Sequence, residues 1–367
     1  MTERATGLLQ QPFSDAVMAR PLPDLSEAIS DFIARRLPPA SHPLGAAARH
    51  HFAAPGKQIR ARMALAAADS FSVPGTAALP WAAAVEVLHN ASLVHDDICD
   101  GDKVRRGHAS VWSRYGRDMA LALGDWLIAL SFELAAEAAH KGRTPLLVSL
   151  LARHMSATTS GQALEFGTDL YPEWSDYMNI STGKTAPLLI APAEGIAHLA
   201  GRRDVLQPLV SFFTAAGACY QIANDMLNVA GTDGANSPAS DLMRRAPNAV
   251  IVMFRTTLDR NSAAEFDKWL ASSDTTRAPG WQAKLRRSLA MQMTASSLLN
   301  MMEQADASSA QFPVDCHAVI SSLTLLIWSL IFSSSLIISV LVLLVCSFSF
   351  SISSVHLVLA ATDAVLA

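Results

Sequence analysis

The chain has 367 residues and a formal net charge of −4, and hydrophobic residues make up 51% of it. This length suffices for one large domain or two ordinary ones, and the slightly acidic balance argues against a general nucleic-acid binder. The four cysteines form no CxxC pair and no metal-like spacing, so a reducing cytoplasm is expected. Segments rich in Ala and Leu, with little period-two alternation, favour an all-α fold.

The first 23 residues form a polar leader that Pro12, Pro21 and Pro23 interrupt. The leader contains no apolar core of the length that a signal peptide needs. Beyond it, apolar residues recur at helical spacing, and prolines and glycines mark the breaks. We predict helices over about residues 24–37, 44–52, 56–71, 80–100, 116–140, 145–169, 174–199 and 205–230, with further helices between 247 and 304. Pro187 and Pro192 are expected to interrupt the helix 174–199.

Three carboxylates stand at the end of the predicted helix 80–100. Asp96, Asp97 and Asp100 have the spacing DDxxD, which places Asp96 and Asp100 on one helix face and Asp97 about 100° round from them. Like charges this close repel one another unless a cation neutralises them. Oxygen ligands without histidine or cysteine are typical of Mg²⁺, whose shell is usually completed by water and substrate phosphate oxygens.

Two arginines, Arg105 and Arg106, follow the aspartates, and their planar guanidinium groups match diphosphate oxygens. The simpler alternative is a solvated acidic helix end followed by a basic turn. The helix 80–100, however, is apolar on nearly every face, and an aspartate cluster at the end of a buried helix is costly unless a cation lies beside it. We therefore favour a functional site over a solvated surface.

A second basic segment, GKQIR at residues 56–60, opens the predicted helix 56–71. Gly56, Lys57 and Arg60 at a helix start bring backbone N–H groups, the helix dipole and two cations together, which makes a seat for an anion. Taken by itself, an ordinary helix start with solvated cations is the simpler interpretation. His89 lies two turns before Asp96 and is either a hydrogen-bonded core histidine, the usual case, or a phosphate donor.

Two later segments also stand out. Gly183, Lys184 and Thr185 break an apolar helical run, as happens where the backbone faces a ligand; without the GxxxxGK spacing, they are not a P-loop. Asn224, Asp225 and Asn228 repeat the geometry of the first aspartate cluster, with two amides in place of carboxylates.

The last part of the chain changes in character. Residues 316–362 contain no Lys, Arg, Asp or Glu, and residues 320–350 consist largely of Leu, Ile, Val, Phe and Ser. Because about 20 apolar residues span a bilayer, we predict a C-terminal transmembrane anchor. A buried terminal helix and a translated frameshift are the alternatives.

The order and spacing of several motifs resemble those of the trans-isoprenyl diphosphate synthases, the polyprenyl synthetase family. The resemblance rests on FAAPGKQIRARMALAAA, LHNASLVHDDICDGDKVRRGHASVW, GKTAPLL and YQIANDMLN, and covers about residues 25–260. It implies an all-α isoprenoid synthase-type bundle around a central cavity, usually as a homodimer. We assign residues 24–310 to this domain, between the leader 1–23 and the hydrophobic tail 316–362, which would add a C-terminal helix.

The resemblance also assigns roles to residues. Asp96, Asp97 and Asp100 match the motif that binds Mg²⁺ and the allylic diphosphate, and Arg105 matches the arginine that holds the same diphosphate. The residues that match the isopentenyl diphosphate seat are Gly56, Lys57, Arg60, His89 and Arg106. Lys184, Thr185 and Gln221 match residues that help to hold the allylic substrate and its leaving group. The implied reaction joins the two diphosphates into a trans-polyprenyl diphosphate that is one isoprene unit longer.

Two departures from the family pattern weaken the second half of the site. The second motif of the family is also DDxxD, whereas this chain has Asn224, Asp225 and Asn228. Asn can ligate Mg²⁺ through its carbonyl oxygen without bringing charge, so Asn224 and Asp225 are expected to bind the metal more weakly. The lysine that usually follows is Ala246 here, with Arg244 and Arg245 as candidate substitutes.

Product length is predicted from the helix before the first aspartate. Short-chain members carry a bulky aromatic residue at the positions that Ala91 and Ser92 occupy here, and Leu88 lies one turn further down on the same face. Small side chains leave the cavity floor open, so we expect a product of twenty carbons or more.

Two other functions remain open. One is a class I terpene synthase-like cyclase that ionises a single diphosphate, although Thr232 stands where that group's metal-binding Glu would be, and such an enzyme needs no second diphosphate seat. The other is a degenerate regulatory subunit that pairs with an active synthase, which the intact first motif argues against.

Overall fold

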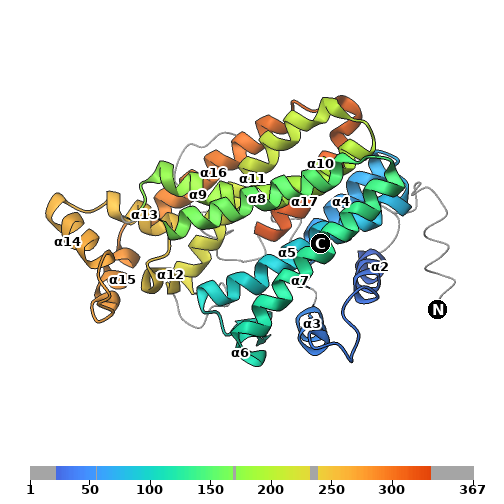
Figure 1. The fold of residues 1–367 in the computed structure, drawn as a ribbon. Helices are drawn as coiled ribbons and strands as arrows, with labels where there is room; N and C mark the ends of the chain where they lie inside the picture. The colour runs from blue at the N-terminus through green and yellow to red at the C-terminus, as the bar shows by residue number, and fades with distance from the viewer. Residues whose placement is uncertain (1–21, 55, 168–170, 232–238, 332–367) are drawn as a thin grey trace. The chain divides into compact units, whose positions relative to one another are not determined.

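The structure is a computed structural model that describes residues 22–54, 56–167, 171–231 and 239–331 (Figure 1). The described chain is built from helices, with one two-stranded antiparallel sheet, so the prediction of an all-α fold is confirmed. The chain divides into two compact units, one within residues 1–155 and 190–206 and the other within 156–189 and 207–367. The boundary between them runs through two helices, α8 (Leu146–Phe166) and α10 (Pro187–Leu199).

The first unit is organised around α5 (Gly75–Asp100), which packs most extensively along α7 (Arg117–Gly142) and then along α4 (Ile59–Ser70) (Figure 1). Nearly every residue of α5 before His89 is buried, because its alanines allow neighbouring helices to approach on all sides. The unit also contains α2 (Leu22–Ala34), α3 (Gly45–Phe52), α6 (Val111–Tyr115) and the short 3₁₀ helix η1 (Arg203–Val205).

The helix α5 begins five residues before the predicted start at Pro80. A proline inside a helix removes one backbone hydrogen bond, and the burial of Trp81 next to it offsets that loss. The Trp81 indole donates a hydrogen bond of 3.1 Å to the carbonyl of Pro192 and lies against Gly195, where a Cβ would come within 2.0 Å of the ring. Gly195 is therefore required by the packing of α10 on α5.

A short hairpin follows α5 and was not predicted. Its strands are β1 (Val104–Arg105) and β2 (His108–Ala109), and Arg105 pairs with His108. Arg106 and Gly107 form the turn with φ values of 52° and 79°. Positive φ at both central residues is typical of the tight hairpin turns that match strand twist. The hairpin fixes the directions of the two arginines.

The second unit contains α9 (Trp174–Thr185), most of α11 (Leu206–Ala230) and the helices that follow it. These are α12 (Ser240–Arg244), α13 (Ala249–Thr256), α14 (Arg260–Leu270), α15 (Ala278–Arg287), α16 (Ala290–Ser309), η2 (Val314–Cys316) and α17 (His317–Ile331). Its core includes a cluster of aromatic rings from α13, α14 and α15, in which Phe266 and Trp281 have centroids 4.8 Å apart.

The predicted helix 174–199, expected to be interrupted at Pro187 and Pro192, is two helices in the structure, α9 and α10, which meet at Ala186 and Pro187. Proline has no N–H to continue the helical ladder, so the break falls at Pro187 and leaves Gly183 and Lys184 in the last turn of α9. Pro192, the other predicted interruption, lies inside α10.

The predicted leader and most of the predicted tail lie outside the described residues; α17 is the described part of the tail. Among the described residues, two helical segments are long and apolar enough to cross a bilayer, Arg117–Gly142 and Arg203–Ala230. Core helices of soluble proteins pass the same test, and 44% and 56% of these segments is buried in the structure.

Candidate functional site

The first aspartate motif lies in the last two turns of α5, which ends at Gly101 in the left-handed conformation (φ 71°). Asp97 is buried with 1% exposure, whereas Asp96 and Asp100 are half-buried. Carboxylates at a helix C-terminus face the negative end of the helix dipole. This end of α5 therefore needs nearby positive charge.

Arg105 supplies part of that charge from the hairpin. Its Nε donates a hydrogen bond of 2.8 Å to Oδ1 of Asp97, its NH2 forms an ion pair with the same oxygen, and it lies 3.9 Å from Asp102. Burial raises the pKa of the Asp97 carboxyl, and Arg105 opposes this rise. The other carboxylate oxygen of Asp97, Oδ2, is buried and has no hydrogen-bond partner among the described residues.

The donor set at this end of α5 suits Mg²⁺. An unpartnered, buried carboxylate oxygen costs free energy unless something binds it, and Asp96 and Asp100 add hard oxygens nearby. In the described part of the chain, no three His, Cys, Asp or Glu side chains converge closely enough to hold a metal by themselves.

Arg106 points to a different segment from Arg105. Its NH1 donates a hydrogen bond of 2.6 Å to the carbonyl of Ala54, and its guanidinium lies over Gly56, where a Cβ would come within 2.8 Å of it. Gly56 has a φ of 71°, which favours glycine. The structure thus brings Arg106 to the predicted anion seat, where Lys57 is exposed and Arg60 half-buried in the first turn of α4.

His89, the remaining residue predicted for this seat, is half-buried on α5. Burial holds the pKa of His89 well below its usual value, and the positive charges of Arg60, Arg106 and Arg105 add to this effect. This lowering of the pKa favours the neutral imidazole, which donates a hydrogen bond from only one ring nitrogen.

Three residues near this seat were not predicted from the sequence: Glu86, Asn90 and His51. Glu86 is buried and accepts hydrogen bonds from the Ala61 N–H at 3.2 Å and from the Asn90 amide at 3.4 Å. His51 Nε2 lies 3.0 Å from Asn90 Oδ1, and burial lowers the pKa of His51 to about 4. A glutamate within the apolar run of α5 was the one available sequence signal.

A small pocket of about 20 Å³ lies between α3 and the hairpin. This volume holds about one water molecule. The lining carries several basic groups and no carboxylate, and includes His50, His51, Arg105, Arg106 and His108.

In the second unit, the predicted allylic-site residues Lys184, Thr185 and Gln221 lie on α9 and α11. Lys184 Nζ forms an ion pair of 2.9 Å with Glu165 of α8, and Thr185 Oγ1 donates a 3.4 Å hydrogen bond to Gln221 Oε1. A Cβ on Gly161 would lie 2.3 Å from the Lys184 backbone nitrogen. The glycine thus allows α8 and α9 to pack backbone to backbone at this point.

The carboxylate of Asp225, in the second motif, is 2% exposed and accepts three hydrogen bonds. Oδ2 accepts from the Tyr177 hydroxyl and from the Ala249 N–H, both at 2.7 Å. Oδ1 accepts from Gln221 Nε2 at 2.9 Å. Burial and the nearby charge of Asp241 raise the pKa of Asp225 to about 8 against the effect of these donors.

Asn228, the last position of the second motif, binds the start of α12. Its Nδ2 donates to the Ser240 hydroxyl at 2.7 Å, and its Oδ1 accepts from the Asp241 N–H at 3.3 Å. Asp241 in turn accepts from Asn248 at 2.9 Å and from Arg244 at 2.8 Å. Asn224 is half-buried, so it is the most accessible of the three motif positions.

The two arginines considered as substitutes for the family lysine both have structural contacts. Arg244 pairs with Asp241. Arg245 stacks on Trp269 at 3.7 Å from the ring centroid and donates to three backbone carbonyls, including that of Asp274 at 2.7 Å. Both guanidinium groups are therefore held by contacts within the protein.

The predicted chain-length residues lie on α5 four to eight residues before Asp96. Leu88 is 3% exposed and Ala91 is fully buried. Ser92 is half-buried and donates a hydrogen bond of 2.8 Å to the His89 carbonyl.

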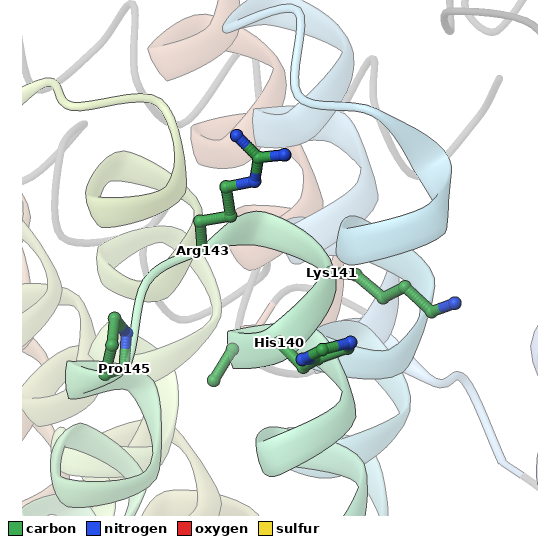
Figure 2. Close-up of a pocket in the computed structure, with 5 residues that line it drawn as sticks. His140, Lys141, Arg143 and Pro145 are labelled. Carbon is green, nitrogen blue, oxygen red and sulfur yellow. The ribbon is translucent and has the colours of Figure 1, made fainter.

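A larger pocket, of about 500 Å³, lies at the turn between α7 and α8 and contains none of the predicted site residues. It is lined by Ala139, His140, Lys141, Arg143 and Pro145. Figure 2 shows the Lys141 and Arg143 side chains extending in different directions from the end of α7, so their charges do not converge on one point.

The family described as polyprenyl synthetase matches residues 41–283 of the chain. A curated relative, the (2E,6E)-farnesyl diphosphate synthase of Mycobacterium bovis, is 33% identical over 251 residues, which are 63% of this chain and 68% of that protein. The geranylgeranyl diphosphate synthase of Saccharolobus solfataricus is 35% identical over 191 residues, covering 50% of this chain and 57% of that one.

Among solved structures, a decaprenyl diphosphate synthase from Rhodobacter capsulatus matches the fold with a TM-score of 0.74 and 22% identity, over 85% of this chain and 98% of that one. A polyprenyl synthase from Caulobacter crescentus, complexed with calcium and isoprenyl diphosphate, matches with a TM-score of 0.71 and 25% identity, over 82% of this chain and 94% of that one.

Proposed function

Because the chain belongs to the polyprenyl synthetase family and is a trans-prenyltransferase, we propose that it condenses an allylic diphosphate with isopentenyl diphosphate in a magnesium-dependent reaction. The product is a trans-polyprenyl diphosphate of twenty carbons or more. The prediction of the family from sequence motifs is confirmed; the residue roles and the product length are our proposals.

The observation that carries this proposal is the hairpin after α5. It turns two adjacent arginines to two different anion seats, Arg105 to Asp97 at the end of α5 and Arg106 to the loop at Gly56. A reaction that joins two diphosphates needs two such seats, whereas a cyclase that ionises one diphosphate needs only one.

The first seat would hold the allylic diphosphate. Asp96, Asp97 and Asp100 present the oxygens that fit Mg²⁺, and Arg105 would pair with phosphate oxygens in place of Asp97. When bound, Mg²⁺ supplies positive charge that neutralises the leaving diphosphate. Arg105 provides further charge stabilisation at the same position, so departure of the diphosphate from the allylic carbon becomes easier.

The second seat would hold isopentenyl diphosphate through Gly56, Lys57, Arg60, His89 and Arg106. Arg106 is held by Ala54 and lies over Gly56, which orients its remaining donors before substrate arrives. Such preorganisation lowers the entropic cost of binding. The alkene held there would attack the allylic cation, and the released diphosphate is a base of the right kind to take the proton.

Lys184, Thr185 and Gln221 are proposed to help hold the allylic substrate and its leaving group. The ion pair between Lys184 and Glu165 and the hydrogen bond from Thr185 to Gln221 keep these groups together within the second unit. We further propose that the enzyme works as a homodimer and that its catalytic domain is cytoplasmic, with the hydrophobic tail as a membrane anchor.

The regulatory-subunit function remains the second candidate because the second motif has lost two carboxylates and the following lysine is Ala246. A single assay distinguishes the candidates: the full chain with Mg²⁺ and farnesyl diphosphate, with and without isopentenyl diphosphate. We expect elongation that requires both substrates. Hydrocarbon formed from farnesyl diphosphate alone would identify a cyclase, and the absence of turnover together with stable binding to another synthase would identify a regulatory subunit.

A further inference from the structure

Two hydrogen bonds join the hairpin to α3 and to the loop that follows α3. The Nε2 atom of His50, in the last turn of α3, lies 2.7 Å from the carbonyl oxygen of Ala109 in β2. At the turn of the hairpin, Arg106 NH1 donates to the carbonyl of Ala54 at 2.6 Å. Ala54 lies four residues after His50 and two before Gly56. The hairpin is therefore held against one short segment of chain at two points.

The Ala109 carbonyl takes no part in the hydrogen-bond ladder of the hairpin. Ala109 lies opposite Val104, and the next residue, Ser110, donates its N–H to the Lys103 carbonyl at 2.9 Å. Hydrogen-bonded and non-hydrogen-bonded positions alternate along an antiparallel pair. Ala109 therefore occupies a non-hydrogen-bonded position, and its carbonyl points away from β1 toward His50.

The partners of His50 fix which ring nitrogen carries the hydrogen. Arg114 NH1 lies 3.0 Å from Nδ1, and a guanidinium can only donate, so Nδ1 accepts. Arg114 is exposed, and a lysine there could also donate to Nδ1. A carbonyl oxygen can only accept, so Nε2 carries the hydrogen and donates to Ala109. The ring packs edge-on against Tyr115, with centroids 5.5 Å apart, so the imidazole is held in one tautomer and one orientation.

The bond from His50 does not depend on the state of Arg106. In the proposed function, a phosphate oxygen competes with the Ala54 carbonyl for the donors of Arg106. The bond between His50 and Ala109 involves neither of these groups. It can therefore keep β2 against α3 while Arg106 changes partners.

We infer that His50 is a positioning residue for the proposed isopentenyl diphosphate seat: from α3 it holds β2 by the Ala109 carbonyl and so keeps Arg106 directed to the loop at Gly56. His50 acts through the hairpin and not by touching the substrate. The inference rests on the proposed function in assigning Arg106 and Gly56 to isopentenyl diphosphate.

Two substitutions at position 50 separate this role from simple packing. His50→Phe keeps a ring against Tyr115 but cannot donate to Ala109, so the hairpin loses one of its two attachments. We expect the Michaelis constant for isopentenyl diphosphate to rise about fivefold, the factor that corresponds to one net hydrogen bond. The kcat and the Michaelis constant for farnesyl diphosphate should change by less than about twofold.

His50→Gln provides the rescue, because its amide can place an N–H group near the position of Nε2. This variant should bind isopentenyl diphosphate within about twofold of the unaltered chain. An equal rise of the Michaelis constant in His50→Phe and His50→Gln would overturn the positioning role. An equal rise for both substrates in His50→Phe would also overturn it, because the effect would not be specific to the seat of Arg106.

The matched control is His317→Phe in the second unit. His317 Nε2 lies 3.2 Å from the backbone carbonyl of Phe312, so the same substitution removes the same kind of contact. We expect both Michaelis constants to stay within about twofold of those of the unaltered chain. A fivefold rise for isopentenyl diphosphate in this variant would show a general effect of the substitution and contradict the role of His50.

Hydrogen exchange of the full chain, followed by mass spectrometry, measures the contact without substrate. In His50→Phe, peptides that cover residues 103–110 should exchange about fivefold faster than in the unaltered chain, and His50→Gln should exchange as the unaltered chain does. Peptides from α7 should keep their rates in both variants, which verifies that the chain is folded. Unchanged exchange of residues 103–110 in His50→Phe would overturn the inference alone. If the unaltered chain elongates no substrate, the proposed function fails and the seat fails with it, even where exchange shows that His50 holds the hairpin.

Discussion

At the scale of single residues, two neighbouring arginines point to different parts of the molecule, which composition alone does not show. Arg105 and Arg106 are neighbours in the chain, yet one pairs with Asp97 and the other with the Ala54 carbonyl. The left-handed conformation of Arg106 (φ 52°) at the hairpin turn is the cause, because it reverses the chain between the two side chains.

Replacing Arg106 by lysine tests the second seat. A lysine has a single charged group and cannot both hold the Ala54 carbonyl and present a planar fork to a phosphate. We expect the Michaelis constant for isopentenyl diphosphate to rise about tenfold or more while that for the allylic substrate changes little. The control is Arg114→Lys, an exposed arginine on α6, and an effect of the same size there would contradict the assignment.

His51 gives the protein a defined response to acid. Its pKa is about 4 in the folded chain and 6.5 when unperturbed, so below pH 6.5 the unfolded chain binds a proton that the folded chain excludes. The stability that the neutral imidazole confers is present above pH 6.5 and is lost as the pH falls toward 4, by about 3 kcal/mol at most.

The measurement is the melting temperature between pH 7.5 and pH 4 for the unaltered chain and for His51→Gln. Glutamine can still hydrogen-bond to Asn90 but does not titrate, so the variant should lose less stability on acidification. His108→Gln, at an exposed position of the hairpin, should follow the unaltered chain. Parallel curves for all three proteins would show that His51 does not carry the pH response.

At the scale of elements, glycines and small residues decide how closely helices approach. Gly161 allows the backbone of α8 to meet that of α9 at Lys184, and Gly195 allows α10 to lie against Trp81 on α5. From the sequence alone, both glycines are expected to destabilise their helices, because glycine costs about 1 kcal/mol in a helix relative to alanine. Their role is visible only once the partner helix is known.

Gly161→Ala is expected to destabilise the protein by about 1–3 kcal/mol, because the added methyl meets backbone atoms that cannot move aside. The matched control is Gly280→Ala in α15, where an added Cβ has no atom within 4 Å and should be neutral or stabilise by about 0.5–1 kcal/mol. Denaturant unfolding measures both. Equal stability of the two variants would be inconsistent with the close contact between α8 and α9.

On α5, Ala91 is the position expected to limit chain length. Ala91→Phe replaces a methyl group by a ring at the predicted floor of the cavity. The product should therefore become shorter by at least one isoprene unit. Chromatography of the dephosphorylated products measures this change. Ala91 is fully buried, so the variant is checked for folding by its melting temperature. Ser92→Phe, at a half-buried position, provides the same test with less risk, and unchanged products in both variants would contradict the predicted floor.

At the scale of the whole molecule, each unit contains one of the two motifs, and the two have different local structures. The first motif ends a buried helix and keeps an unpartnered carboxylate oxygen; the second is tied into the helices around it. The helical fold matches that of solved prenyl synthases, while the two motifs differ in the hydrogen bonds that their side chains make.

The hydrophobic tail gives a prediction for the full chain. If it anchors the enzyme, the full chain should float with liposomes in a density gradient, and a chain that ends at Ile331 should not. Leu343→Arg is the matched control, since an arginine at the centre of a spanning segment costs about 2.5–3.5 kcal/mol and should weaken flotation. Equal flotation of the full and shortened chains would contradict the anchor.

The sequence by itself determined the fold class, the family and most helix positions, because these follow from the local spacing of apolar residues and from motifs such as DDxxD and GKQIR. It also located the departures at Asn224 and Asn228. It also predicted the interruption at Pro187, where α9 gives way to α10. It did not reveal the hairpin or the buried partners Glu86, Asn90 and His51.

The tertiary structure decided which protein donors form hydrogen bonds to each carboxylate. Asp97 and Asp225 stand at the same position of two similar motifs, one flanked by Asp96 and Asp100 and the other by Asn224 and Asn228. Their hydrogen bonding differs because two residues far along the chain, Tyr177 and Ala249, donate to Asp225. Hydrogen bonds between distant segments depend on how helices pack, and periodicity within one helix carries no information about the side chains that it will meet.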